Sequence, residues 1–160
     1  MAETLQELYA LLDRFLAEDV EAEALDEVYE KIMDLSFARL GDLLVEGERF
    51  DLKNPEDLFA LRGVYEHALQ RWDEGDFRGA AELFGVLAHM VDDEELKKSF
   101  LLSLALAAQK ESMDRFLDEF VDLQNARGFF FVPRKEKAEE YLKKHSRLIE
   151  SELEKIRRGG

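Results

Sequence analysis

Apolar residues recur at every third or fourth position along most of the chain, which is the period of an amphipathic α-helix. The alternation of apolar and polar residues that marks a β-strand is almost absent, and the sequence contains only two prolines. This pattern predicts an all-α protein. We expect seven helices, approximately over residues 5–18, 21–45, 55–72, 77–91, 93–110, 113–125 and 134–156.

Three of the expected helices begin at residues that cap a helix well. The run Thr4-Leu5-Gln6-Glu7 fits a capping box, in which the first side chain accepts a hydrogen bond from the backbone of the fourth residue. Asn54 and Ser112 are good N-cap residues for the third and sixth helices. The second helix contains Ser36 and Gly41, and either position is one where it could bend or divide.

The third and fourth helices are joined by only three residues, Glu74-Gly75-Asp76. A connection this short places the two helices side by side as an antiparallel hairpin. Trp72 is therefore expected between helices, near the turn. The fifth helix is apolar on nearly all sides between Phe100 and Ala108, so it should be the most buried helix.

The length of 160 residues is typical of one domain. We expect a single helical domain with three parts. These are N-terminal helices in residues 1–46, two repeat-like hairpins in residues 54–125 and a C-terminal helix in residues 134–158.

The first hairpin resembles a tetratricopeptide repeat, through the run Tyr65-x-x-Ala68-x-x-x-Trp72-x-x-Gly75-Asp76-Phe77-x-x-Ala80-x-x-x-Phe84. An offset of about 36–37 residues repeats this pattern less well in the second hairpin. Glu111-Ser112 stands there in place of the turn glycine, and Phe116 in place of a small residue. The resemblance implies a right-handed array of antiparallel helix pairs that binds other proteins.

The chain is also similar to the small acidic chaperones of type III secretion translocators in its size, its charge and its tetratricopeptide-like core. Those chaperones normally carry a third repeat, which the region Gly128–Pro133 does not match. This second resemblance implies a constant client protein with an apolar segment that needs masking.

The resemblance to a tetratricopeptide repeat also implies a binding site. The positions at which that family contacts peptides fall on Val64, His67, Arg71 and Glu74. These residues would form a peptide groove of mixed charge, and the flanking helices would complete it. The alternative is an ordinary solvated helix face beside the core.

The consecutive residues Phe129, Phe130 and Phe131 form a second candidate site. Alternate side chains of an extended segment point in opposite directions, so the three rings cannot all enter one core. One face of the segment can fill the helical core while Phe130 stays outside. Either the segment is a buried connection, or it exposes an apolar patch for a partner or a second copy of the chain.

The net charge of −15 argues against nucleic acid as a partner, because nucleic-acid binding needs a basic surface. Residues 1–60 hold 17 acidic and 5 basic residues, whereas residues 133–160 hold 9 basic and 6 acidic residues. The last helix could dock on the acidic half, within the chain or between two chains, and a basic partner would compete for it. The alternative is that these charges only keep the helix faces solvated.

The residues needed for common enzyme chemistry do not form a recognisable pattern. The sequence has no cysteine, and its three histidines fall on three different helices without the Glu-x-x-His spacing of di-iron bundles. It also lacks a Gly-x-Ser-x-Gly turn and a glycine-rich phosphate loop. We expect no catalytic residues, no metal site and no cofactor.

The sequence therefore favours a non-enzymatic protein-interaction module, an adaptor or a small chaperone, that binds a peptide or helix of a partner. The expected partner segment is basic or amphipathic. Three alternatives remain: a secretion chaperone, a self-associating helical protein that forms a homodimer through residues 129–132 or the last helix, and an enzyme whose buried carboxylate or histidine site the linear sequence hides. No apolar run reaches the roughly 20 residues that span a membrane, and we expect a cytoplasmic protein.

Overall fold

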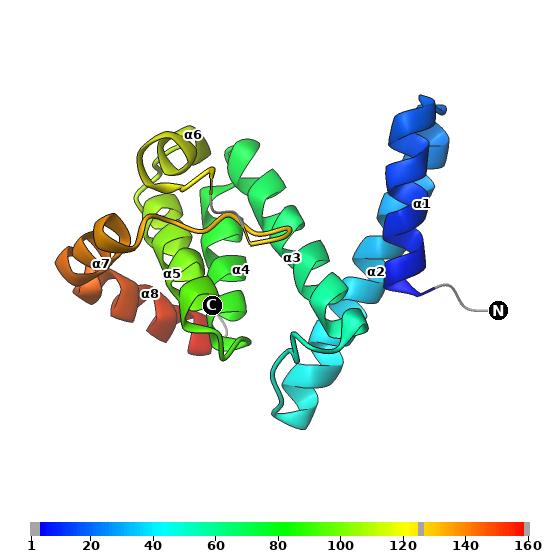
Figure 1. Cartoon of the computed structure of the whole chain (residues 1–160). Helices are drawn as coiled ribbons and strands as arrows, with labels where there is room; N and C mark the ends of the chain where they lie inside the picture. Colours follow the sequence, from blue (N-terminus) through cyan, green and yellow to red (C-terminus); the bar gives the residue numbers. More distant parts are fainter. Residues whose placement is uncertain (1–3, 125–126, 159–160) are drawn as a thin grey trace. The chain divides into compact units, whose positions relative to one another are not determined.

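The computed structural model describes residues 4–124 and 127–158 (Figure 1). Within these residues the chain forms eight α-helices, a short π-helical segment and no β-strand, which confirms the all-α fold class. The elements are α1 (Leu5–Glu18), α2 (Ala22–Glu46), α3 (Pro55–Asp73), α4 (Phe77–His89), α5 (Glu94–Ala108), α6 (Met113–Arg115), η1 (Phe116–Phe120), α7 (Lys135–Lys144) and α8 (Ser146–Arg157).

The chain divides into two compact units, Met1–Val64 and Tyr65–Gly160. The boundary falls inside α3, so the first half of this helix belongs to the first unit and the second half to the second unit. The predicted domain also includes residues that lie outside the described ones, namely 1–3, 125, 126, 159 and 160.

The first unit is built on a hairpin of α1 and α2. Thr4 caps α1 as expected, because its side chain accepts a hydrogen bond of 3.1 Å from the backbone of Glu7. Helix α2 runs without interruption from Ala22 to Glu46. It therefore does not divide at Ser36, which is fully buried, or at Gly41, which has open space around its backbone.

A buried carboxylate ties α2 and α3 together in this unit. The side chain of Asp57 is only 2% exposed and accepts a hydrogen bond of 2.7 Å from Arg39 of α2. Its other oxygen accepts a hydrogen bond of 2.8 Å from the backbone of Asp51, in the link before α3. Asn54 caps α3 as expected, by accepting a hydrogen bond from the backbone of Glu56 at 2.9 Å.

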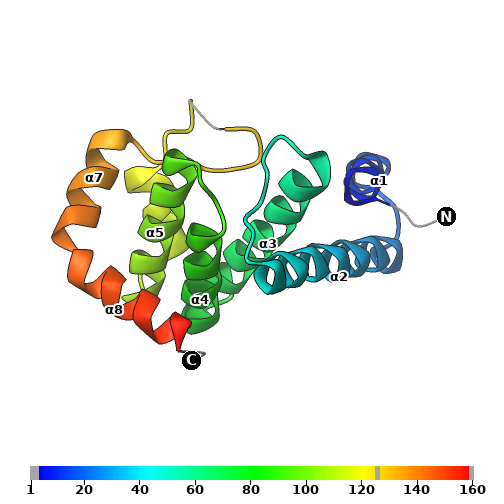
Figure 2. The same cartoon turned by 90° about the horizontal axis from the view of Figure 1, so that it is seen from below.

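The second unit is centred on α4 and α5, which lie side by side in both views (Figures 1 and 2). Helix α7 packs on α5, and α8 contacts both α4 and α5. Gly85 of α4 allows this packing, because a β-carbon there would collide with Ile156 of α8. Nine of the fifteen residues of α5 are buried, which confirms the expectation that this helix lies deepest.

The turn between α3 and α4 forms as the sequence predicts. Gly75 has a φ of 89°, and the side chain of Asp76 caps α4 by accepting a hydrogen bond of 2.9 Å from the backbone of Gly79. Trp72 is 2% exposed, and its ring packs against Phe84 with a centroid distance of 5.5 Å. The tryptophan therefore lies in the core near the turn, as expected.

Two predicted helices are wrong in extent. The sixth does not reach residue 125: α6 has three residues, η1 follows it, and Val121 is already extended and pairs with Pro133. The last predicted helix divides at His145, whose ring stacks on Tyr141 with a centroid distance of 4.0 Å. The second repeat-like hairpin therefore lacks its second long helix, and the tetratricopeptide-like array stays a prediction.

The left-handed conformation of Gly75 can be tested by substitution. We expect Gly75→Ala to lower the free energy of unfolding by about 1–2 kcal/mol, because a side chain disfavours a positive φ. Gly41→Ala is the matched control, since it adds the same methyl group to an exposed helix interior and should raise stability by about 0.5–1 kcal/mol. Urea unfolding of both variants measures the difference, and equal effects would contradict the turn assignment.

Candidate partner-binding site

The four positions taken from the repeat resemblance differ in their exposure. The side chain of Val64 is fully buried, so the prediction that it contacts a partner does not agree with its position. His67 and Arg71 are half-buried, and Glu74 is exposed.

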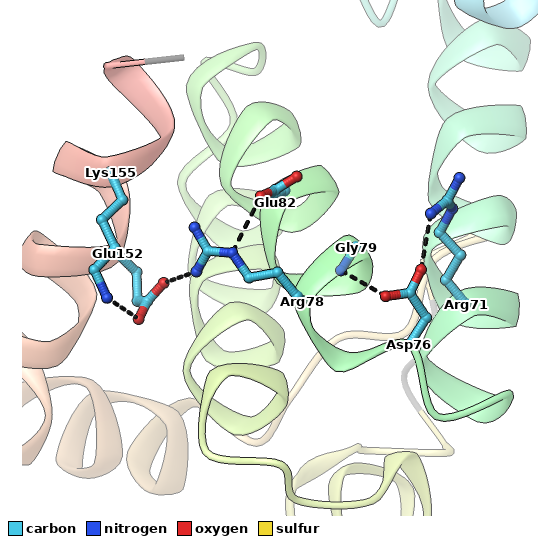
Figure 3. A network of polar contacts seen from close by, with 7 residues as sticks. All are labelled: Arg71, Asp76, Arg78, Gly79, Glu82, Glu152 and Lys155. Carbon is cyan, nitrogen blue, oxygen red and sulfur yellow. Dashed lines mark hydrogen bonds and ion pairs between the residues drawn. The ribbon is translucent and has the colours of Figure 1, made fainter. Parts of the chain in front are cut away.

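His67 and Arg71 are already engaged in a chain of polar contacts, of which Figure 3 shows the part from Arg71 through Asp76 to Gly79. Arg71 donates from Nε to Nε2 of His67 at 3.0 Å, and its Nη1 lies 2.8 Å from Asp76. Partial burial lowers the pKa of His67, and the positive charge of Arg71 lowers it further. The backbone N–H of Gly79, followed by Arg71, lowers the pKa of Asp76.

A second group of contacts in the same view joins α4 to α8 (Figure 3). Arg78 bridges Glu82 at 3.1 Å and Glu152 at 2.7 Å, and Lys155 lies 3.3 Å from Glu152. The Glu152 side chain is 9% exposed, so two cations balance a nearly buried carboxylate. The hydrogen bond to Glu152 raises the pKa of Arg78. This arrangement holds the two helices together.

The phenylalanine segment is largely a buried connection, one of the two alternatives that the sequence left open, but the ring that was placed outside lies inside. Residues 127–130 form a tight turn, with Gly128 at a φ of 57°. Phe130, expected outside, is 4% exposed and packs on Tyr65 of α3 and Phe100 of α5 at centroid distances of 5.3 and 6.4 Å. Phe129, at the turn, is 40% exposed instead.

The segment that follows the turn is bonded to α5. Ser99 donates a hydrogen bond of 2.7 Å to the carbonyl oxygen of Phe131, which is half-buried. Burial raises the pKa of the Tyr65 hydroxyl, and the nearby Phe131 backbone acts in the opposite direction. The chain therefore fills the space between α3 and α5 with its own Phe130, so this space is closed to a peptide.

A surface on α2 was missed by the sequence reasoning. Four of its apolar residues are half-exposed or exposed and form what we call the apolar row: Tyr29, Met33, Phe37 and Leu44. Tyr29 is 44% exposed and Leu44 is 48% exposed. The helical period predicts that Tyr29 lies on the core-facing side with Val28 and Ile32, and its exposure contradicts that prediction.

Three exposed acids accompany the apolar row: Asp26, Glu30 and Asp34, which we call the acidic row. Each stands three positions before an apolar residue, and residues three apart are neighbours on a helix surface. None of the three acids has an ion-pair partner among the residues that the structure describes. The repeated spacing of an acid, two residues and an apolar residue was the signal in the sequence that could have revealed this surface.

The surroundings of the two rows are acidic and partly apolar as well. Residues 1–64 hold 17 acidic and 6 basic residues. Further apolar side chains of this unit are exposed: Leu16, Leu35 and Val45, at 55%, 39% and 89%. The first unit therefore offers apolar surface bordered by negative charge.

Metal binding and membrane spanning were also considered. Among the described residues, no group of three or more His, Asp or Glu side chains is placed to hold a metal ion. None of the described helices combines the length and the apolar character that crossing a bilayer requires. Comparison with known proteins gave no significant match to a protein family, a curated protein or a solved structure.

The packing of Phe130 gives a prediction with a neighbouring control. We expect Phe130→Ala to lower the free energy of unfolding by about 3–5 kcal/mol, because it removes a buried ring from the aromatic cluster. Phe129→Ala should cost less than about 1 kcal/mol, because that ring is largely in solvent. Chemical denaturation of the two variants gives both values, and a larger loss at Phe129 would reverse the assigned orientation.

The contact between His67 and Arg71 predicts a pH effect. Nε2 of His67 accepts a hydrogen bond only while the ring is neutral, so we expect His67 to titrate below the usual histidine pKa of about 6.5. The stability from this neutral ring is present above that pKa and is lost as the pH falls. NMR titration measures the midpoint, and Arg71→Gln should raise it. A midpoint at or above the usual value, or one unchanged in the variant, would refute the assignment.

Proposed function

We propose that this protein is a non-enzymatic interaction module, an adaptor or a small chaperone, that binds an apolar segment of another protein through the apolar row of α2. The observation that carries the proposal is the exposure of Tyr29 and Leu44, which border the buried side of α2. Exposed apolar surface with a polar border is typical of protein–protein contact sites.

The proposed site differs from the one that the repeat resemblance implies. On α3, Val64 is buried and Arg71 is bound to His67 and Asp76, so little free surface remains there. Between α3 and α5, Phe130 occupies the space. In the apolar row, by contrast, the side chains of Tyr29 and Leu44 remain exposed to solvent. This exposure favours α2 over α3 as the contact surface.

The function can be tested by affinity capture from the cell that makes the protein, with mass spectrometry of the retained proteins. We expect one stoichiometric partner that the double variant Tyr29→Ser/Leu44→Ser retains at least about tenfold less, because burying exposed apolar side chains drives most association. Leu123→Ser is the matched control, since Leu123 is 71% exposed but lies in the second unit.

Two outcomes would contradict the proposal. The first is that the capture experiment recovers no partner. The other is a partner that binds the wild type and the double variant equally, because such a partner uses another surface. Circular dichroism of both variants establishes that a loss of capture does not come from unfolding.

A further inference from the structure

We infer that the partner segment is an amphipathic helix of another protein, with an apolar stripe that is bordered on one side by lysine or arginine. This inference rests on the proposed function and specifies the chemistry of the partner. The apolar row supplies the contact for the stripe, and the acidic row supplies the contact for the cations.

The length of the apolar row suits a helix. Tyr29 and Leu44 are fifteen positions apart on one continuous helix, which corresponds to about 22 Å. A partner helix of about four to five turns would cover this distance. An extended peptide usually binds by pairing its backbone with free backbone N–H and C=O groups of its partner. Helix α2 offers none along its length, because these groups are bonded to one another inside the helix.

The spacing of the apolar residues also suits a helix. Met33, Phe37, Leu40 and Leu44 follow one another at intervals of four, three and four residues, which is the spacing of a coiled-coil seam. Leu40 is 6% exposed and so already packs within the first unit. The side chains at the other seam positions, Met33, Phe37 and Leu44, are half-exposed or exposed, so a second helix can cover them.

The charges determine which helix fits. Packed helices lie about 8–10 Å apart, a distance that a lysine or arginine side chain can bridge. A cation beside the partner's apolar stripe would then meet Asp26, Glu30 or Asp34, which have no ion-pair partner in the described part of the chain. An acidic flank would instead place like charges together and weaken binding.

A second copy of the chain fits this surface poorly. A symmetric dimer through α2 would place the two acidic rows against or near each other, because both copies present the same patch. The helices of the basic C-terminal region are already packed, since α7 lies on α5 and α8 lies on α4 and α5 with Ile149 buried. We therefore commit to a different protein as the occupant.

The experiment uses the full-length protein and three synthetic helical peptides of equal length. All three carry the same leucine seam, and they differ in one flank, which contains lysine, glutamine or glutamate. We expect the lysine peptide to bind about tenfold more tightly than the glutamine peptide at low salt, since exposed ion pairs each contribute modestly. This advantage should shrink in about 0.5 M salt, where exposed charges are screened.

Matched variants locate the effect on the acidic row. The triple variant Asp26→Asn/Glu30→Gln/Asp34→Asn should lose the preference for the lysine peptide. The control variant Asp118→Asn/Glu140→Gln/Glu150→Gln has the same net charge and removes three exposed acids of the second unit, so it should keep the preference. Equal loss in both variants would show attraction by net charge alone and would overturn the inference.

The remaining outcomes separate the inference from the proposed function. If the lysine and glutamine peptides bind equally and Tyr29→Ser weakens both, the apolar site stands and the basic partner is wrong. If none of the peptides binds, a helical partner is wrong, whatever the capture experiment shows. If sedimentation equilibrium gives a dimer that Tyr29→Ser dissociates, the occupant is a second copy and the inference is overturned.

Discussion

The buried carboxylate of Asp57 is the constraint on which the first unit depends. An unpaired charge at a site that is 2% exposed would cost several kcal/mol, so Arg39 and the backbone of Asp51 must stay within bonding distance of it. Arg39 therefore sets which side of α2 faces α3. Close packing of Ser36 against Gly63 reinforces this, because a β-carbon at Gly63 would collide with that serine. Because these contacts fix the orientation of α2 about its own axis, the side chains of Tyr29 and Leu44 cannot turn toward the core.

The second unit uses similar constraints to cover its apolar surface. Gly85 lets α8 approach α4 closely, and Arg78 and Lys155 neutralise Glu152 at the edge of that contact. Phe130 closes the space between Tyr65 and Phe100. The two units thus differ in what they leave uncovered. In the first unit, apolar side chains remain beside Asp26, Glu30 and Asp34, which have no ion-pair partner among the described residues, and this difference is why the proposed contact lies on α2.

Local patterns in the sequence predicted most of the helices but little of the candidate site. Periodicity and capping residues such as Thr4 and Asn54 depend on neighbours in the chain, so they could be read directly. The early end of the sixth helix accompanies the pairing of Val121 with Pro133, a contact between residues too far apart in the sequence for a local pattern to contain. Phe130 was assigned to the wrong side because alternation gives two faces without saying which one meets the core.

The contacts that close each unit also have a consequence for synthesis on the ribosome. The first unit is joined by Leu5 and Glu56, which are 51 positions apart, whereas Arg78 and Glu152 of the second unit are 74 apart. Because domains made first can fold first, the proposed binding surface can form while α8 is still being translated. Until α8 arrives, the side of α4 around Gly85 is covered by Leu104 of α5 but lacks its contacts with Ile156 and Leu153. A stalled nascent chain would thus combine a finished N-terminal hairpin with an open apolar core, a state that cellular quality control can distinguish from the complete protein.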